Sequence, residues 1–88
     1  MRTTFRTSFL RDLKKIKERT VLDRIRQAIE QVETARTLQD IGDLKKMTGT
    51  NRYYRIRVGE YRIGVAVEGD TVDFVRCLRR RDLYRYFP

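Results

Sequence analysis

The sequence predicts a small α+β fold in which two N-terminal helices pack on one face of an antiparallel β-sheet. Two observations carry this prediction. Apolar residues recur with a 3.6-residue period in the first part of the chain, and they alternate with polar residues from Tyr53 onward. The expected order of elements is β-α-α-β-β-β. A length of 88 residues corresponds to one domain, spanning residues 1–88.

A short strand over residues 3–6 and two amphipathic helices are expected in the first part of the chain. Ser8 is predicted to cap the first helix, whose apolar positions are Phe9, Leu10, Leu13 and Ile16. Thr20 is predicted to cap the second helix, with Asp23 three residues later. Its apolar stripe comprises Val21, Leu22, Ile25, Ala28, Ile29, Val32 and Ala35. We expect this stripe to be core, and residues 40–51 to form a connecting segment.

Three strands are predicted after the helices. In the first, over residues 53–58, Tyr54, Ile56 and Val58 share one face and the intervening residues share the other. Gly59-Glu60 suits a two-residue type II′ turn, and alternation resumes over residues 61–67. A third strand over residues 72–78 follows the turn at residues 68–70. A two-residue turn would place Arg76 on the apolar face, so a bulge or a snorkelling side chain is expected there.

The predicted hairpin brings arginines together on its polar face. If Val58 pairs with Tyr61, Arg57 lies opposite Arg62, and Arg55 lies opposite Gly64. Like charges directly opposed on one sheet face repel each other, so a compensating ligand is expected. Guanidinium groups with Tyr53 at their rim would suit a phosphodiester beside a stackable base.

The overall charge also favours an anionic ligand. The formal net charge is +9, and every basic residue after Lys46 is arginine, including the run Arg79-Arg80-Arg81 after the last strand. Such a chain is expected to bind a polyanion through phosphate neutralisation. The alternative is that nearby carboxylates neutralise the hairpin arginines at the surface. The candidates for this pairing are Glu60, Glu68 and Asp73.

Composition excludes several classes of chemistry. The chain has no histidine and a single cysteine, Cys77, so an internal disulfide, a Cys/His zinc site and a histidine-based triad are all excluded. We expect no metal and no cofactor, and we expect Cys77 to be a small apolar strand residue. No apolar run approaches the roughly 18–20 residues of a membrane span. A cytoplasmic protein without membrane contact is therefore expected.

Several segments together resemble the RelE branch of the RelE/ParE toxin superfamily. They read LKKMTG at residues 44–49, YRIRVGEYRI at 54–63, VDFVR at 72–76 and RRDLYR at 80–85. The resemblance covers nearly the whole chain, and the hairpin string is its specific part. Members of this branch are the toxin halves of bacterial and archaeal type II toxin–antitoxin pairs. The resemblance implies a growth-regulating endoribonuclease, an mRNA interferase, that cleaves mRNA in the ribosomal A site.

The resemblance also implies site residues. The catalytic positions fall on Arg55, Arg57, Arg62, Arg80 and Tyr84. The RNA-binding positions are expected at Tyr53, Arg79, Arg81, Lys45 and Lys46. The register at the end of the chain leaves Arg81 as an alternative to Arg80. The implied chemistry is metal-independent attack of a ribose 2′-hydroxyl on the adjacent phosphorus, which leaves a 2′,3′-cyclic phosphate and a 5′-hydroxyl.

The chain departs from the family pattern at the expected acid–base positions. Many relatives carry a histidine before the C-terminal arginine and a glycine before that, where this chain has Arg79 and Leu78. Arginine is a poor general base because its pKa lies above about 12. Glu60 and Tyr84 are the remaining titratable candidates near the hairpin. We therefore expect electrostatic and positional catalysis to dominate, with slow or absent cleavage of free RNA.

Partners follow from the same resemblance: a cognate antitoxin, the ribosome and mRNA, with no small-molecule cofactor. Exposed aromatic residues on a cationic surface suit an acidic amphipathic segment of an antitoxin, and the helical face is an alternative docking surface. These aromatic residues are Tyr53, Tyr84, Tyr86 and Phe87. Two other functions stay open. One is a ParE-like, non-enzymatic toxin that inhibits DNA gyrase, and the other is a catalytically inactive homologue that binds antitoxin or nucleic acid.

Overall fold

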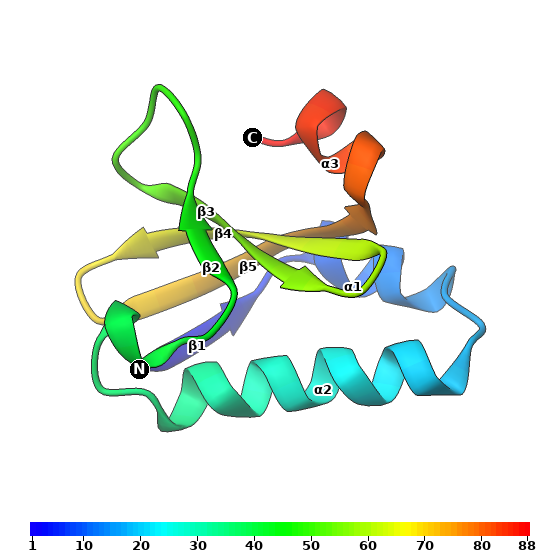
Figure 1. Ribbon diagram of the computed structural model, residues 1–88, viewed down its shortest axis with the longest axis horizontal. Helices are drawn as coiled ribbons and strands as arrows, with labels where there is room; N and C mark the ends of the chain where they lie inside the picture. The colour runs from blue at the N-terminus through cyan, green and yellow to red at the C-terminus, as the bar shows by residue number, and fades with distance from the viewer.

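A computed structural model describes all residues from 1 to 88 as a five-stranded sheet with helices on both sides (Figure 1). The elements in chain order are β1 (Arg2–Phe5), α1 (Thr7–Lys14), α2 (Arg19–Thr34), a 3-10 turn (Leu38–Asp40), β2 (Leu44–Lys46), β3 (Tyr53–Val58), β4 (Tyr61–Glu68), β5 (Thr71–Arg79) and α3 (Arg80–Tyr86). The strand order is β1-β5-β4-β3-β2. Only β1 and β5 are parallel, so the sheet is mixed and not wholly antiparallel as expected.

The predicted α+β class is confirmed, and two elements are added to it. The short edge strand β2 lies within the segment that was expected to be a connection, and α3 replaces the expected polar tail. Figure 1 shows α2 along one side of the sheet and α3 on the other, the side toward which the β2–β3 loop also rises. We call the α3 side of the sheet the outer face.

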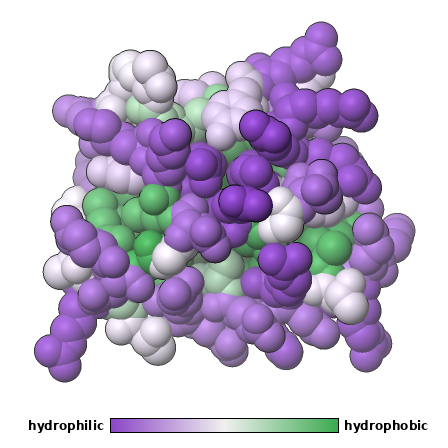
Figure 2. Space-filling view, in the orientation of Figure 1, coloured by the Kyte–Doolittle hydropathy of each residue, from purple (hydrophilic) through white to green (hydrophobic).

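The core lies between the sheet and the first two helices. The α2 stripe is confirmed, with Ile25 and Val32 fully buried against apolar residues of β3, β4 and β5. In α1, Phe9 is buried and its ring lies tilted 5.3 Å from that of Phe74, but Leu10, another of the predicted apolar positions, is exposed. Figure 2 shows hydrophilic side chains covering most of one face, with small apolar patches between them. No helix is long and apolar enough to cross a membrane.

Both predicted helix caps are wrong. Glu18 is the N-cap of α2 and Arg6 that of α1, and neither helix has a side-chain cap hydrogen bond. Thr20 instead lies in the first turn of α2. Ser8 lies inside α1, where its hydroxyl donates to the carbonyl of Val75 at 2.6 Å. A tertiary contact has therefore overridden the local capping preference.

Beyond the end of β1, residues of α1 form hydrogen bonds with the edge of β5. The carboxylate of Asp12 accepts a hydrogen bond from the backbone N–H of Cys77 at 2.9 Å, and from Nε of Arg76 at 2.8 Å. This part of β5 follows a β-bulge at Val75, because Val65 pairs with Phe74 whereas Gly64 pairs with Arg76. The bulge confirms the expected irregularity: it places Cys77 in the core and leaves Arg76 free to reach α1.

Candidate functional site

Four arginines gather on the outer face at the end of the β3–β4 hairpin. The predicted register is confirmed, with Arg57 opposite Arg62 and Arg55 opposite Gly64. The turn is also as expected, since Gly59 has a φ of 58° while Glu60 does not have a positive φ. We call Arg55, Arg57, Arg62 and Arg80 the arginine cluster.

Arg62 is the central member of the arginine cluster. Its side chain is largely buried, and its Nη1 donates to the carbonyls of Gly59 at 2.7 Å and Tyr61 at 2.9 Å. These two bonds fix the guanidinium, while its Nε is buried without a partner, as is Nε of Arg55. Buried donors without partners are rare in folded proteins. The cluster therefore holds unused hydrogen-bond donors in a fixed position.

The surroundings of Arg62 are electrostatically unfavourable for a cation. Burial lowers the pKa of Arg62, and the charges of Arg55, Arg57 and Arg80 lower it further, whereas Tyr84 acts in the opposite direction. The other four predicted catalytic residues thus all lie close enough to Arg62 to influence it. An anion bound here would relieve this repulsion.

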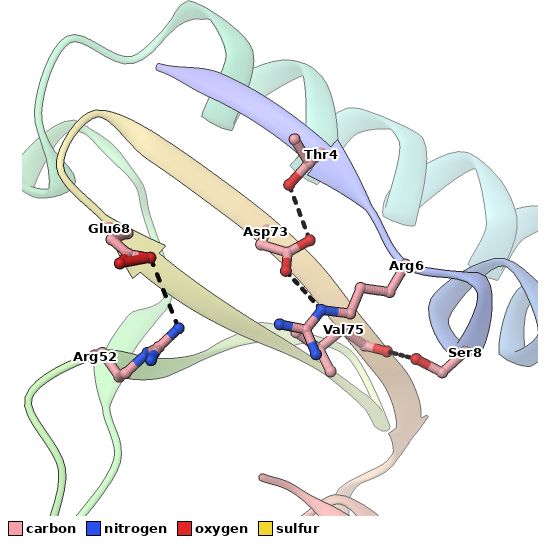
Figure 3. Close-up of polar contacts among 7 residues, drawn as sticks. All are labelled: Thr4, Arg6, Ser8, Arg52, Glu68, Asp73 and Val75. Carbon is pink, nitrogen blue, oxygen red and sulfur yellow. Dashed lines mark hydrogen bonds and ion pairs between the residues drawn. The ribbon is translucent and has the colours of Figure 1, made fainter.

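No carboxylate neutralises the arginine cluster. The chain forms four ion pairs, and none of them includes a cluster member. Figure 3 shows where two of the expected carboxylates go: Asp73 pairs with Arg6 at 2.7 Å, and Glu68 lies 3.8 Å from Arg52, both at the other end of the outer face. Glu60 forms no ion pair. The alternative prediction, that nearby carboxylates pair with the hairpin arginines, is therefore wrong.

The remaining predicted residues are divided between the two faces. Lys45 pairs with Arg55 on the outer face, but Lys46 pairs with Tyr54 and so lies on the opposite face. Arg79 pairs with Tyr61, and its guanidinium lies 5.1 Å from the centre of the Tyr61 ring. Like Lys46, it therefore lies on the face covered by α2, opposite the outer face.

The tip of the hairpin carries a separate hollow. Glu60, Arg79, Arg80 and Arg81 line it, and its volume is about 370 Å³. Arg80 is shared between this hollow and the surroundings of Arg62, whereas Arg79 and Arg81 are not among the groups that shift the pKa of Arg62. Its electrostatic effect on Arg62 therefore favours Arg80 over Arg81 as the cluster member.

The C-terminal residues were expected to form an exposed aromatic surface, and this is only partly so. Tyr84 and Tyr86 are exposed, but Phe87 is buried on the outer face. Its ring meets the ring of Tyr53 edge-on at a centroid distance of 5.5 Å. Leu83 is also fully buried. The spacing of Leu83 and Phe87 by four residues is the sequence signal that indicates α3 and its buried face.

Comparison with known proteins places this fold among the toxins of type II toxin–antitoxin systems. Residues 4–84 match the family described as ParE toxin of type II toxin–antitoxin system, parDE. The chain belongs to this family, and within it to the RelE branch.

The RelE assignment comes from closely similar archaeal relatives. The chain is 44% identical to Toxin RelE3 of Methanocaldococcus jannaschii over the full length of both proteins. Its fold matches the toxin in the RelB–RelE antitoxin–toxin complex from Methanococcus jannaschii with a TM-score of 0.81 and 42% identity, over 97% of this chain and 99% of that one. A YoeB dimer from Staphylococcus aureus matches with a TM-score of 0.73 at 19% identity, over 91% and 97% of the two chains, and this supports the fold alone. The protein is thus a toxin of the RelBE type.

Proposed function

We propose that this toxin is a ribosome-dependent endoribonuclease that cleaves mRNA and so inhibits translation in the cytoplasm. The observation that carries the proposal is the arginine cluster itself: four guanidinium groups beside an exposed tyrosine, with no carboxylate paired to any of them. A gyrase-binding toxin has no need of such convergent arginines, and this favours the nuclease over the ParE-like alternative.

The proposed reaction is a transesterification within the RNA backbone. The 2′-oxygen forms a bond to phosphorus while the bond from phosphorus to the 5′-oxygen breaks. The proton leaves the 2′-hydroxyl and a proton is delivered to the 5′-oxygen, so the products are a 2′,3′-cyclic phosphate and a 5′-hydroxyl. Arg57, Arg62 and Arg80 stabilise the charge that develops on the phosphorane. The two bonds that fix Arg62 make this a preorganised contribution.

Positioning has a large share in the proposed mechanism. The chain has no histidine, and the arginines stay protonated at neutral pH. Tyr84 stacks on the base or donates a proton to the leaving oxygen, and Glu60 is the nearby carboxylate of the hairpin turn. Holding a reactive geometry is worth about 7–11 kcal/mol in favourable cases. In this proposal the ribosome supplies that geometry, and the A site is where the mRNA is presented.

The proposed regulatory partner is a cognate antitoxin. The archaeal relative with 42% identity was solved as a complex of RelE with RelB. An antitoxin segment with acidic side chains would neutralise the arginine cluster and cover Tyr84, which is exposed. Binding of this kind would exclude mRNA from the same surface.

Induced expression with separate labelling of protein, RNA and DNA synthesis tests the proposed function. We expect wild-type toxin to stop protein synthesis first, and Arg62→Ala to abolish this effect. The matched control is Arg6→Ala, which removes an arginine from the other end of the outer face. Blocked replication with continued translation would contradict the proposal and select the gyrase-inhibiting alternative. Absence of growth inhibition by a folded, antitoxin-binding toxin would indicate an inactive homologue.

A further inference from the structure

We propose that Phe87, packed against Gly64, is a positioning residue that holds α3, and with it Tyr84, close to Arg62. The inference rests on the proposed nuclease function and adds to it a requirement at two positions outside the arginine cluster. Phe87 and Gly64 touch neither the phosphate nor the base in this proposal. They act through the helix that carries two of the proposed site residues.

The contact between Phe87 and Gly64 requires a glycine for space. A Cβ added at position 64 would lie 2.8–2.9 Å from Cγ, Cδ1 and Cδ2 of the Phe87 ring, closer than carbon atoms approach in folded proteins. Gly64 is not among the glycines with a positive φ, so its backbone conformation is open to other residues. Position 64 therefore requires glycine to leave room for the ring of Phe87, and not to allow an unusual backbone conformation.

The contact between Phe87 and Gly64 matters because, beyond the bond from the N–H of Arg80 to the carbonyl of Glu60 at its start, α3 has few other attachments. The helix has seven residues, no side-chain cap and only one fully buried residue of its own, Leu83. A helix this short is unstable without tertiary contacts. Phe87 follows Leu83 by one turn, and its N–H donates to the carbonyl of Leu83 at 2.8 Å. The two buried side chains therefore place α3 on the outer face, and Tyr53 contacts the edge of the ring.

The residues that α3 presents belong to the proposed site. Tyr84 and Arg80 lie in α3, and both influence the pKa of Arg62, which lies on β4. Tyr84 is more than half exposed, so packing around its own ring does not fix it. If the contact of Phe87 with Gly64 is lost, Tyr84 loses its position relative to Arg62, whereas Arg80 directly follows β5 and its N–H donates to the carbonyl of Glu60 at 3.0 Å. A displacement of about 1 Å at a reacting centre can cost roughly 10²-fold in rate.

A volume exchange between the two positions tests this inference. The variants are Gly64→Ala, Phe87→Leu and the double variant, with Gly42→Ala as the matched control, because a Cβ at position 42 meets only the Gln31 side chain at 3.5 Å. Two quantities are measured: cleavage of mRNA on purified ribosomes, and amide hydrogen exchange of α3 compared with β3 and β4. The exchange measurement does not depend on any nuclease activity.

We expect Gly64→Ala to slow cleavage at least tenfold and to speed amide exchange in α3, with the exchange of β3 and β4 unchanged. Phe87→Leu should act in the same direction. The double variant should recover most of the cleavage, because the added methyl group offsets the smaller side chain. Gly42→Ala should match wild type in both measurements.

The inference is overturned if Gly64→Ala leaves exchange in α3 and cleavage at wild-type values. It is also overturned if exchange rises throughout the sheet and the double variant recovers nothing, because the contact would then serve general stability. A wild-type toxin that cuts no mRNA would overturn the proposed function, and with it the role in cleavage. The exchange data would still decide whether Phe87 holds α3.

Discussion

At the scale of single residues, the arginine cluster is a place where the protein tolerates repulsion. Arg57 and Arg62 are directly opposed on one face, without a carboxylate partner for either. Such pairs are destabilising by roughly 0.2–1 kcal/mol. Sites that bind ligands commonly sacrifice stability in this way. The repulsion between these arginines should therefore be measurable in the free toxin.

Replacing Arg57 with glutamine should stabilise the toxin. Arg57→Gln keeps a long side chain and removes one of the two opposed charges, so we expect the free energy of unfolding in urea to rise by about 0.2–1 kcal/mol at low salt. The gain should shrink at high salt because exposed charges are screened. Arg26→Gln is the control, since Arg26 lies on α2 in an exposed 3.7 Å pair with Asp23. A loss of stability in Arg57→Gln would contradict this account.

Cys77 gives a second residue-scale prediction, concerning pH. Burial, with a smaller contribution from Asp12, raises the pKa of the Cys77 thiol from 9.0 to about 12. Between these values the unfolded chain has lost a proton that the folded chain keeps. Stability should therefore fall as pH rises from 9 toward 12, by at most about 1.4 kcal/mol per pH unit from this group. Unfolding in urea at several alkaline pH values should show a shallower decline for Cys77→Ala, and an identical decline would be the contrary result.

At the scale of elements, a buried carboxylate is one of the contacts that tie α1 to the sheet. Asp12 is 5% exposed and accepts hydrogen bonds from Arg76 and from the backbone of Cys77. Its hydrogen bond is the main reason that the pKa of Arg76 is raised, so the guanidinium stays charged throughout the usual pH range. Removal of a buried partner of this kind leaves polar groups unsatisfied in β5.

We expect Asp12→Ala to lower the free energy of unfolding by about 2–3 kcal/mol. The value lies below that for a fully buried pair because the Arg76 side chain is partly exposed. Asp23→Ala is the matched control, because its exposed pair on α2 should contribute no more than about 1 kcal/mol. Thermal or urea unfolding of the two variants measures the difference. Equal stability losses would show that the contact between α1 and β5 lies elsewhere.

The helices and strands differ in how well the sequence predicts them. Periodicity predicted β3, β4, β5 and α2 well, because their alternating or helical apolar residues all face one core. The predicted cap at Ser8 failed because its hydroxyl bonds to β5, a contact between residues distant in sequence. The strand β2 is only three residues long and carries two lysines, too little pattern to recognise.

The candidate site followed from the sequence to a similar degree. The Arg57–Arg62 register depended only on the turn at Gly59, which short-range rules describe well. The place of Lys46 depended on the pairing of β2, which pattern alone could not supply. The burial of Phe87 depended on its contact with Gly64, which joins the last turn of the chain to the centre of the sheet.

At the scale of the whole molecule, charge is sorted along the outer face. Ion pairs occupy one end, where Asp73 and Glu68 pair with arginines, and the arginine cluster occupies the other. The net charge of +9 therefore matters less than this separation. Binding of single-stranded RNA to the cluster should release counterions in proportion to the phosphates contacted.

This separation predicts a local change in the salt dependence of RNA binding. The logarithm of the association constant should fall with the logarithm of salt concentration by about 0.7 for each phosphate contact. Arg57→Gln should lower this slope by about 0.7, whereas Arg6→Gln, at the paired end, should leave it unchanged. Fluorescence anisotropy of a short labelled RNA over a range of salt concentrations measures both slopes. Equal changes in the two variants would indicate diffuse binding over the whole surface.

Primer extension on mRNA held in purified ribosomes tests most directly whether the unpaired arginine cluster is a nuclease site. We expect cuts within the A-site codon by wild-type toxin and by Arg6→Gln. Cleavage by Arg57→Gln should be slower by at least tenfold, and by Arg62→Lys by about 10²–10³-fold, as when an oxyanion donor is lost. Equal cleavage by all four proteins, or no cleavage by folded wild-type toxin, would contradict the account.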